Sequence, residues 1–255
     1  SRSIITSKKN LIIMPEKRAL LVVTSDNTQF YDDGKKTGLY WAEAIHPYNV
    51  YTKAGYDVDV VSETGSVFLD EHSIADDAMD EESKAAWHDA SNPLKKVIEG
   101  GVLKPSEVDP SKYGIFYASG GHGAVFDFPS AKGLHEIASK IYANDGVVAA
   151  VCHGPAILPF IKDPTTGESL VKGRRVTGFT AEGERLFKVE DAMKKFDVHT
   201  VEELVNEVGG TYVQPPGGPL DDYCISDGRI VSGVNPASAA STAELTISVF
   251  EQLVV

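Results

Sequence analysis

Cys152 and His153 are adjacent at the end of an apolar run, within VVAAVCHGPAIL (147–158). Residues 147–151 are typical of a buried strand, and the Gly-Pro pair that begins at Gly154 is typical of the start of a helix. A strand–cysteine–helix turn is a nucleophile elbow, which crowds the backbone and lifts the side chain toward solvent. The spacing therefore predicts a nucleophilic thiol at Cys152.

A helix that begins after Cys152 would lower the pKa of its thiol, and its backbone N–H groups could stabilise an oxyanion. The alternative for Cys152 is a small buried core thiol. Cys224 lies in a stretch typical of a hairpin strand, so we interpret it as structural. His153 can activate Cys152 only if a third group orients its ring, and spacing alone does not single out one acid among 37.

A glycine-rich loop, ASGGHG (118–123), follows another predicted strand. Next to an elbow it could supply substrate-binding or oxyanion-binding groups at Gly120, Gly121 and His122, with the Gly121 N–H as the leading donor. The alternative is a simple tight turn. The sequence leaves open whether His122 lines a pocket or faces solvent.

Glu43 lies inside the apolar stretch LYWAEAIHP. It either occupies the outer face of a helix or points inward, where burial would raise its pKa and make it a usable acid or base. The histidines have no metal-ligand spacing, so we expect no metal.

The remaining pattern alternates strands with helices. It predicts strands at 18–25, 56–62, 113–119 and 146–151 and helices at 38–54 and 130–145. It also predicts a helix starting at a Thr200/Glu203 capping box, a hairpin at 221–233 that turns at Asp227-Gly228, and a C-terminal helix. Such βαβ units form a parallel sheet whose sites lie beyond the carboxyl ends of the strands. Both the Cys152 and the ASGGHG motifs fall at such ends.

The alternation of strands and helices is interrupted at residues 66–112, which are acidic and contain several potential short helices. We expect this insertion to cap the core and to favour a small, shielded substrate. Residues 1–16 are expected to form a flexible N-terminal extension, and residues 17–255 to form a single α/β domain.

The composition of the chain argues against some classes of binding partner. The chain has 255 residues, a formal net charge of −13 and only two cysteines. An acidic balance argues against nucleic acid or an anionic membrane as partner, and two cysteines cannot build a disulfide framework. We therefore expect a cytoplasmic protein. A nuclear pool, or mitochondrial import directed by the extension, remains as an alternative.

Together, the motifs AVCHGPA, ASGGHG, GKKTGLYWAEAIHP, VSETG, DEHS, TGFTAEGE and GVNPASAASTA resemble the ThiJ/PfpI superfamily, in its fungal-type branch of glutathione-independent glyoxalases. The resemblance implies a flavodoxin-like α/β sandwich with a mainly parallel sheet and a small cap, and usually a homodimer. It implies conversion of methylglyoxal, a 2-oxoaldehyde, to lactate without cofactor or metal. The catalytic residues would be Cys152, His153, Glu184 orienting the histidine, and Glu43 reaching the cysteine from the other side.

Three other functions stay open. Members of this branch are also described as chaperones that hold unfolded proteins, although the sequence offers no exposed apolar patch for that role. A second alternative removes early glycation adducts from proteins or nucleotides. A third is a peptidase or amidase, because an elbow thiol with a histidine suits acyl transfer equally well.

Overall fold

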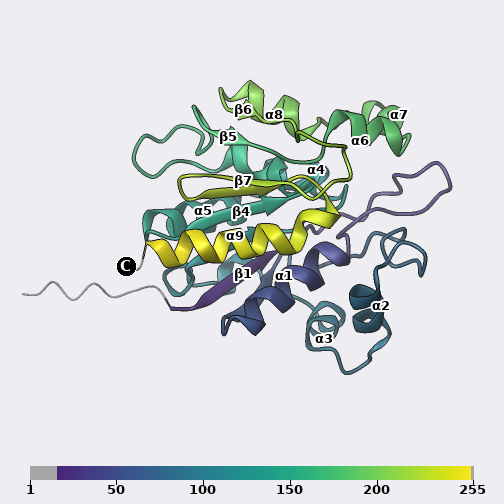
Figure 1. The fold of residues 1–255 in the computed structure, drawn as a ribbon, viewed down its shortest axis with the longest axis horizontal. Helices are drawn as coiled ribbons and strands as arrows, with labels where there is room; N and C mark the ends of the chain where they lie inside the picture. Colours follow the sequence, from purple (N-terminus) through teal and green to yellow (C-terminus); the bar gives the residue numbers. More distant parts are fainter. Residues whose placement is uncertain (1–15, 254–255) are drawn as a thin grey trace, which may run out of the picture.

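The computed structural model describes residues 16–253, and in that range six strands form one central sheet (Figure 1). Neighbouring strands are parallel except for β7, which pairs antiparallel with β8 at one edge. Across the sheet the order is β2 (Asp57–Val61), β1 (Arg18–Val22), β3 (Ile115–Ala118), β4 (Val147–Val151), β8 (Ile230–Gly233) and β7 (Cys224–Asp227).

Helices cover both faces of this sheet. Helices α1 (Ala42–Lys53) and α9 (Ala239–Gln252) pack on one face, while α5 (Lys132–Ala143) and α8 (Val201–Glu207) belong to the core on the other. Successive side chains of a strand point to opposite faces of the sheet. In β1, for example, Leu20 belongs to the core on the α5 and α8 face, and Leu21 to the core on the α1 and α9 face. The expected flavodoxin-like sandwich with a mainly parallel sheet is confirmed.

The hairpin turn is displaced by one residue from its expected position. Asp227 pairs with Ile230, so the two turn residues are Gly228 and Arg229 rather than Asp227 and Gly228. Gly228 has φ +58°, and the first central position of a type II′ turn favours glycine. The predicted capping box is present, because Thr200 and Glu203 exchange side-chain and backbone hydrogen bonds.

The segment 66–112, called the cap segment below, contains α2 (Glu81–His88), α3 (Pro93–Gly100) and two short 3₁₀ helices, η1 (Pro105–Glu107) and η2 (Pro110–Lys112). Its helices α2 and α3 lie on the α1 side of the molecule (Figure 1), whereas η1 and η2 pack against α5 on the other face. The expected extension at residues 1–16 falls almost entirely outside the described residues.

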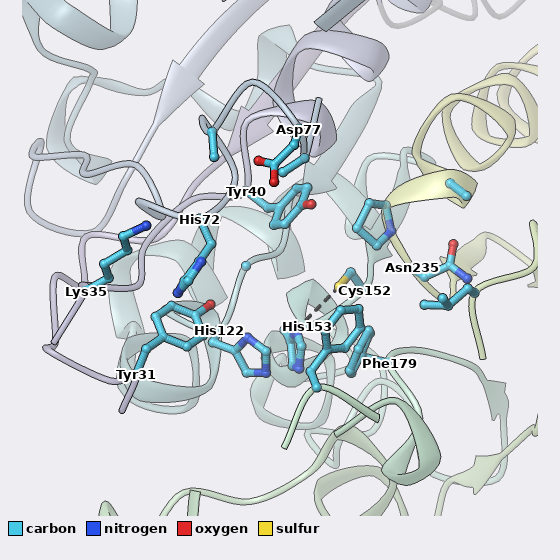
Figure 2. A pocket seen from close by; sticks show the side chains of 17 residues that line it. Tyr31, Lys35, Tyr40, His72, Asp77, His122, Cys152, His153, Phe179 and Asn235 are labelled. Carbon is cyan, nitrogen blue, oxygen red and sulfur yellow. Dashed lines mark hydrogen bonds between the residues drawn. The ribbon is translucent and has the colours of Figure 1, made fainter. Parts of the chain in front are cut away.

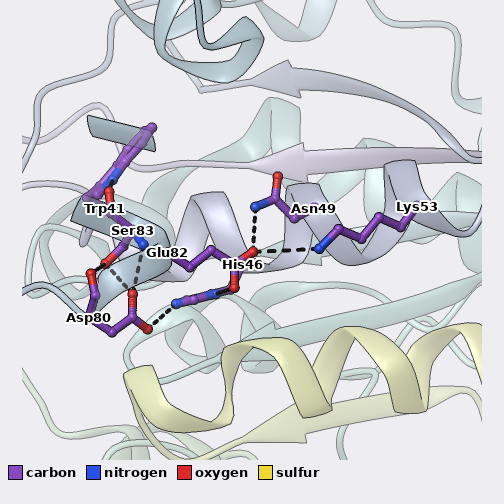
Figure 3. Close-up of polar contacts among 7 residues, drawn as sticks. All are labelled: Trp41, His46, Asn49, Lys53, Asp80, Glu82 and Ser83. Carbon is purple, nitrogen blue, oxygen red and sulfur yellow. Dashed lines mark hydrogen bonds and ion pairs between the residues drawn. The ribbon is translucent and has the colours of Figure 1, made fainter. Parts of the chain in front are cut away.

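Polar contacts attach the cap segment to α1 (Figure 3). The two ring nitrogens of His46 contact Asp80 at 2.6 Å and Glu82 at 3.3 Å, and the Trp41 indole N–H donates to the Ser83 carbonyl at 2.8 Å. Asp80 also caps α2, because its carboxylate accepts the Ser83 N–H. The same residues therefore start α2 and fix it to the core helix.

Shorter elements complete the chain, and none of the helices described here has both the length and the apolar character needed to cross a bilayer. These elements are α4 (Ala124–Asp127), η3 (Phe128–Ser130), η4 (Gly154–Phe160), α6 (Ala181–Leu186), α7 (Glu190–Lys195), η5 (Pro236–Ser238), and a small sheet of β5 (Arg175–Val176) and β6 (Thr211–Tyr212).

Candidate active site

Cys152 lies directly after β4 in a strained turn. Its φ is +61°, a conformation that costs a non-glycine residue roughly 1–3 kcal/mol and that clusters at functional sites. The turn is fixed by hydrogen bonds of its own backbone, since Cys152 N–H donates to Gly233 at 3.0 Å and its carbonyl accepts from Phe179 at 2.7 Å. A Cβ on Gly154 would lie 2.3 Å from the Ala118 carbonyl oxygen, so only glycine fits there. These features match the expected elbow.

His153 is held between the thiol and a carboxylate. Its Nδ1 lies 3.3 Å from Cys152 Sγ, and its Nε2 lies 2.7 Å from Glu184 Oε1. Burial lowers the pKa of His153, so the ring is neutral. With the Nε2 proton donated to Glu184, the lone pair of Nδ1 faces the thiol, which is the arrangement of a general base. Of the 37 acidic residues in the chain, Glu184 is thus the one that orients the histidine.

Glu184 binds two imidazoles. Its second oxygen accepts from His122 Nε2 at 2.8 Å, and the rings of His122 and His153 lie 4.0 Å apart. Burial alone would raise the pKa of Glu184, but the two neighbouring imidazoles outweigh it and hold that pKa well below its usual range. His122 is largely buried and lines the pocket, so the solvent-facing alternative is wrong.

Glu43 points inward from the first turn of α1 and is fully buried, so the outer-face alternative is also wrong. Its Oε2 accepts the Gly120 N–H at 2.7 Å. Its Oε1 has no hydrogen-bond partner in the described residues, and the carboxyl lies beside the Cys152 thiol. Burial raises the pKa of Glu43 to about 8. The carboxyl is therefore largely protonated at neutral pH.

The prediction of a lowered thiol pKa is wrong. Burial, followed by the neighbouring Glu43, raises the pKa of Cys152 well above its usual value, and only 3% of the residue is exposed. The element that follows is the 3₁₀ helix η4 rather than the predicted α-helix, and the backbone N–H of His153 at its start lowers the pKa of the thiol by less than burial and Glu43 raise it. Cys152 is therefore a thiol that must pass its proton to a base, not a free thiolate.

In the glycine-rich loop, Gly120 and Gly121 have different roles. Gly120 donates its N–H to Glu43, so it is not available as an oxyanion donor, and that part of the prediction is wrong. Gly121 has φ +106° and lines the pocket, and its N–H has no acceptor among the described residues. A Cβ there would lie 2.1 Å from the Gly38 carbonyl oxygen. Gly121 remains the candidate oxyanion donor.

A cavity of about 620 Å³ opens above Cys152 at the carboxyl ends of the parallel strands (Figure 2). The cap segment contributes His72, Ala75, Asp77 and Ala78 to its wall. Sequence reasoning did not single out Tyr40, Phe179 or Asn235, which also line it. Asn235 could have been found, because it follows β8, the strand next to β4.

Cys224 lies in β7, outside the residues that line this cavity, as its structural interpretation requires. His122, His153 and Glu184 lie close enough to share a metal ion, but the ring N–H groups already bind the carboxylate at the atoms an ion would need. The arrangement is that of a hydrogen-bonded network.

Known proteins resemble this chain along most of its length. Glyoxalase 3 of Candida albicans is 45% identical, and the glutathione-independent glyoxalase HSP31 of Saccharomyces cerevisiae is 47% identical. Both alignments extend over 234 residues, covering 92% of this chain and 98% of the relative.

Among solved structures, the crystal structure of glyoxalase III from Candida albicans superposes with a TM-score of 0.88 at 45% identity, covering 92% of this chain and 98% of that one. A 24 kDa protein of Francisella tularensis superposes with a TM-score of 0.79 at 28% identity, covering 91% and 98%. The family model described as DJ-1/PfpI family matches residues 37–248, which contain the elbow, the glycine loop, Glu43 and Glu184. The chain therefore belongs to the DJ-1/PfpI family.

Proposed function

We propose that this protein is a glutathione-independent glyoxalase, a lyase that converts methylglyoxal and related 2-oxoaldehydes to 2-hydroxy acids such as lactate. The observation that carries the proposal is the arrangement of Cys152 between a histidine base and a second, protonated carboxyl, at the floor of a cavity. A hydrolase needs the nucleophile and the histidine, whereas a carboxyl on the other side of the thiol suits an additional proton transfer. The names of the relatives support the same activity.

The first step is addition of the thiol to the aldehyde. His153 Nδ1 takes the thiol proton as Sγ attacks the aldehyde carbon, and Glu184 stabilises the imidazolium that forms. We assign stabilisation of the new alkoxide to the backbone N–H groups of Gly121, which lines the cavity, and of His153, whose N–H lies beside the Cys152 thiol. The product is a hemithioacetal, whose oxygen then recovers the proton from His153.

The second step is an internal transfer of hydrogen. A base removes the proton from the former aldehyde carbon, and the electron pair moves to the neighbouring carbonyl to give an enediol. Glu43 is suited to this task, because with a pKa of about 8 it can give its own proton to the neighbouring carbonyl oxygen and, once ionised, take the proton from the former aldehyde carbon. Glu43 then returns that proton to the second carbon and takes up the hydroxyl proton of the first carbon, which leaves a thioester and a protonated Glu43. Water hydrolyses the thioester to the 2-hydroxy acid and the free thiol.

The direct test is to incubate purified protein with methylglyoxal in the absence of thiols and metals and to identify the product. We expect lactate from the wild type and from Cys224→Ser, which controls for loss of a cysteine as such. Cys152→Ala should make none while keeping the wild-type circular dichroism. Unchanged lactate formation by a folded Cys152→Ala would refute the proposal.

A holding chaperone is the second candidate, and one feature favours it. Phe187 and Leu220 line the cavity and are exposed at 54% and 49%, and Leu186 next to them is exposed at 53%. An unfolded chain could bind this apolar rim. The same Cys152→Ala protein should then still suppress the aggregation of a heated client. Loss of both activities in the folded variant would contradict two separate functions.

We also propose that the protein forms a homodimer and is located in the cytoplasm.

A further inference from the structure

The cavity is much larger than methylglyoxal. Its volume is about 620 Å³, within the range of pockets that hold drug-sized ligands. Methylglyoxal has five non-hydrogen atoms, and at about 30 Å³ for each, the share of one water in the liquid, it would occupy roughly a quarter of this space. The residues far from Cys152 therefore have room to bind a longer substrate.

The cavity has two chemically different walls. The apolar lining includes Phe179, Phe187, Leu220 and Pro236, and Phe179 lies near Cys152 in Figure 2. Tyr40, Lys35, His72 and Asp77 line a polar side, and in Figure 2 these four side chains lie across the cavity from Phe179. A carbon chain with several hydroxyl groups matches both walls, because it offers C–H surface along one side and hydrogen-bonding groups along the other.

Tyr40 brings a hydroxyl to the reacting end of this polar wall. In the described residues that hydroxyl has no hydrogen-bond partner, although the side chain is partly buried beside the pocket. Burial, with Glu43 and Cys152 nearby, raises the pKa of Tyr40, so the group stays neutral and can donate. Its backbone is fixed, since its N–H donates to Gly120 at 3.1 Å.

Lys35 and Asp77 form the outer end of the polar wall. Both are exposed, and neither makes an ion pair within the described part of the chain. Neighbouring charges are paired, with His72 bound to Asp33 at 3.0 Å and His88 to Asp76 at 2.8 Å. One positive and one negative group at the same mouth favour an uncharged ligand with hydroxyls over an anion.

The polar wall is built rigidly, because a single buried carboxylate ties its two segments together. Asp70 accepts hydrogen bonds from the Tyr31 hydroxyl at 2.6 Å and from the Thr37 hydroxyl at 2.8 Å. It also accepts the backbone N–H groups of His72 and Ser73. The loop that contains Lys35 and the part of the cap segment that contains Asp77 are therefore held in place before a ligand arrives.

We propose that the protein acts on hydroxylated 2-oxoaldehydes of about six carbons, the class formed when sugars lose water, and that Tyr40, Lys35 and Asp77 select them. This inference rests on the proposed glyoxalase function. The chemistry at Cys152 is unchanged: the aldehyde carbon is oxidised to a carboxylate, the neighbouring carbonyl is reduced to an alcohol, and one water is consumed. A 3-deoxyhexosulose, C6H10O5, would give the 3-deoxyhexonic acid C6H12O6.

The test compares kcat/KM for methylglyoxal, phenylglyoxal and 3-deoxyglucosone. We expect the wild type to use 3-deoxyglucosone at least as well as phenylglyoxal, which has an apolar tail of similar length. Tyr40→Phe and the pair Lys35→Met/Asp77→Asn should each lower kcat/KM for 3-deoxyglucosone by about three- to tenfold, the scale of one or two hydrogen bonds. The Lys35→Met/Asp77→Asn protein should leave methylglyoxal within about twofold, because both side chains lie at the outer end of the cavity. Tyr40→Phe should lower kcat/KM for methylglyoxal by less than it lowers kcat/KM for 3-deoxyglucosone.

The neighbouring pair Lys36→Met/Asp76→Asn is the matched control, since both residues are exposed but lie outside the cavity lining. The inference is overturned if the wild type uses methylglyoxal but not 3-deoxyglucosone, if phenylglyoxal is preferred by tenfold or more, or if the variants impair both substrates equally. Failure of the proposed function would look different, because the wild type would then turn over none of the three. Part of the 3-deoxyglucosone is present in cyclic forms, which lowers its apparent kcat/KM. This factor is the same for every variant, so it cancels when variants are compared on that substrate.

Discussion

At the scale of single residues, the chemistry of the site depends on which of its buried groups carry a proton. Burial raises the pKa of both Cys152 and Glu43, and the neighbouring Glu43 raises that of Cys152 further, whereas the hydrogen bond of the thiol partly offsets the effect of burial on Glu43. On the opposite side, Glu184 stays ionised and keeps His153 ready to accept a proton. The two carboxyls of the site therefore have opposite roles, as their environments move their pKa values in opposite directions.

Glu43→Gln tests the acid–base role of Glu43. The amide keeps the shape of the carboxyl but can neither take nor return a proton. We expect turnover of methylglyoxal to fall by roughly a hundredfold or more, the usual scale for losing a general acid–base group. Addition to Cys152 should persist, and mass spectrometry of the Cys152 peptide after brief exposure to substrate would detect it. Near-normal turnover would remove Glu43 from the mechanism.

At the scale of elements, the site is assembled where four connections meet. The loops after β3, β4 and β8 supply Gly121, Cys152 and Asn235, and the start of α1 supplies Glu43. The loop after β3 packs against the residues before α1 so closely that there is no space for a side chain at Gly121. The position of the oxyanion donor is thus set by a contact between two elements.

Gly121→Ala tests that contact. Its Cβ would lie 2.1 Å from the Gly38 carbonyl oxygen and 2.7 Å from the Tyr40 nitrogen, so the start of α1 would have to move. We expect loss of turnover by a hundredfold or more and a lowered melting temperature. Gly101→Ala is the control, because Gly101 has a similar φ of +96° but nothing within 4 Å of the added carbon. It should cost only the backbone strain, about 1–3 kcal/mol. Equal effects of the two variants would contradict a role for the packing.

At the scale of the whole molecule, the fold holds the site in place, while the buried polar groups of the site lower the stability of the folded protein. A sheet with two covered faces provides enough buried surface to hold strained and buried polar groups at its edge. Burying Glu43 has a consequence for the stability of the whole protein, because its pKa of about 8 in the folded state lies above its ordinary value of 4.5. Ionisation of this group therefore opposes folding.

The pH dependence of unfolding measures that effect. For Glu43 the contribution to stability is complete below pH 4.5 and is lost as the pH rises through about 8. Glu184 has the opposite sign, since its lowered pKa gives a contribution that is present above 4.5 and lost as the pH falls. Between about pH 5 and about pH 9, we expect the free energy of unfolding of the wild type to fall by a few kcal/mol relative to Glu43→Gln.

Asp127, whose pKa burial raises to about 7, is present in both proteins and cancels from this difference. Chemical denaturation at several pH values gives the two curves. A constant difference between them would mean that Glu43 is not buried in its protonated form.

The sequence by itself determined the features that depend on neighbours along the chain. The alternation of apolar strands and helices predicted the parallel sheet, and the short pattern around Cys152 predicted the elbow, because a turn of that kind restricts its own flanking residues. The strand next to β4 and the loop after β3 were predictable for the same reason. Resemblance of longer motifs added Glu43 and Glu184, which local pattern left unassigned.

Only the tertiary structure decided which groups meet and how strongly each holds its proton. Gly120 is occupied by Glu43, His122 shares Glu184 with His153, and the thiol pKa is raised rather than lowered. Each of these results depends on burial and on partners that are distant in sequence, so no local pattern contains them. The volume of the cavity and the polar wall around Tyr40 arise in the same way, from the packing of the cap segment and the loop before α1 over the ends of the strands.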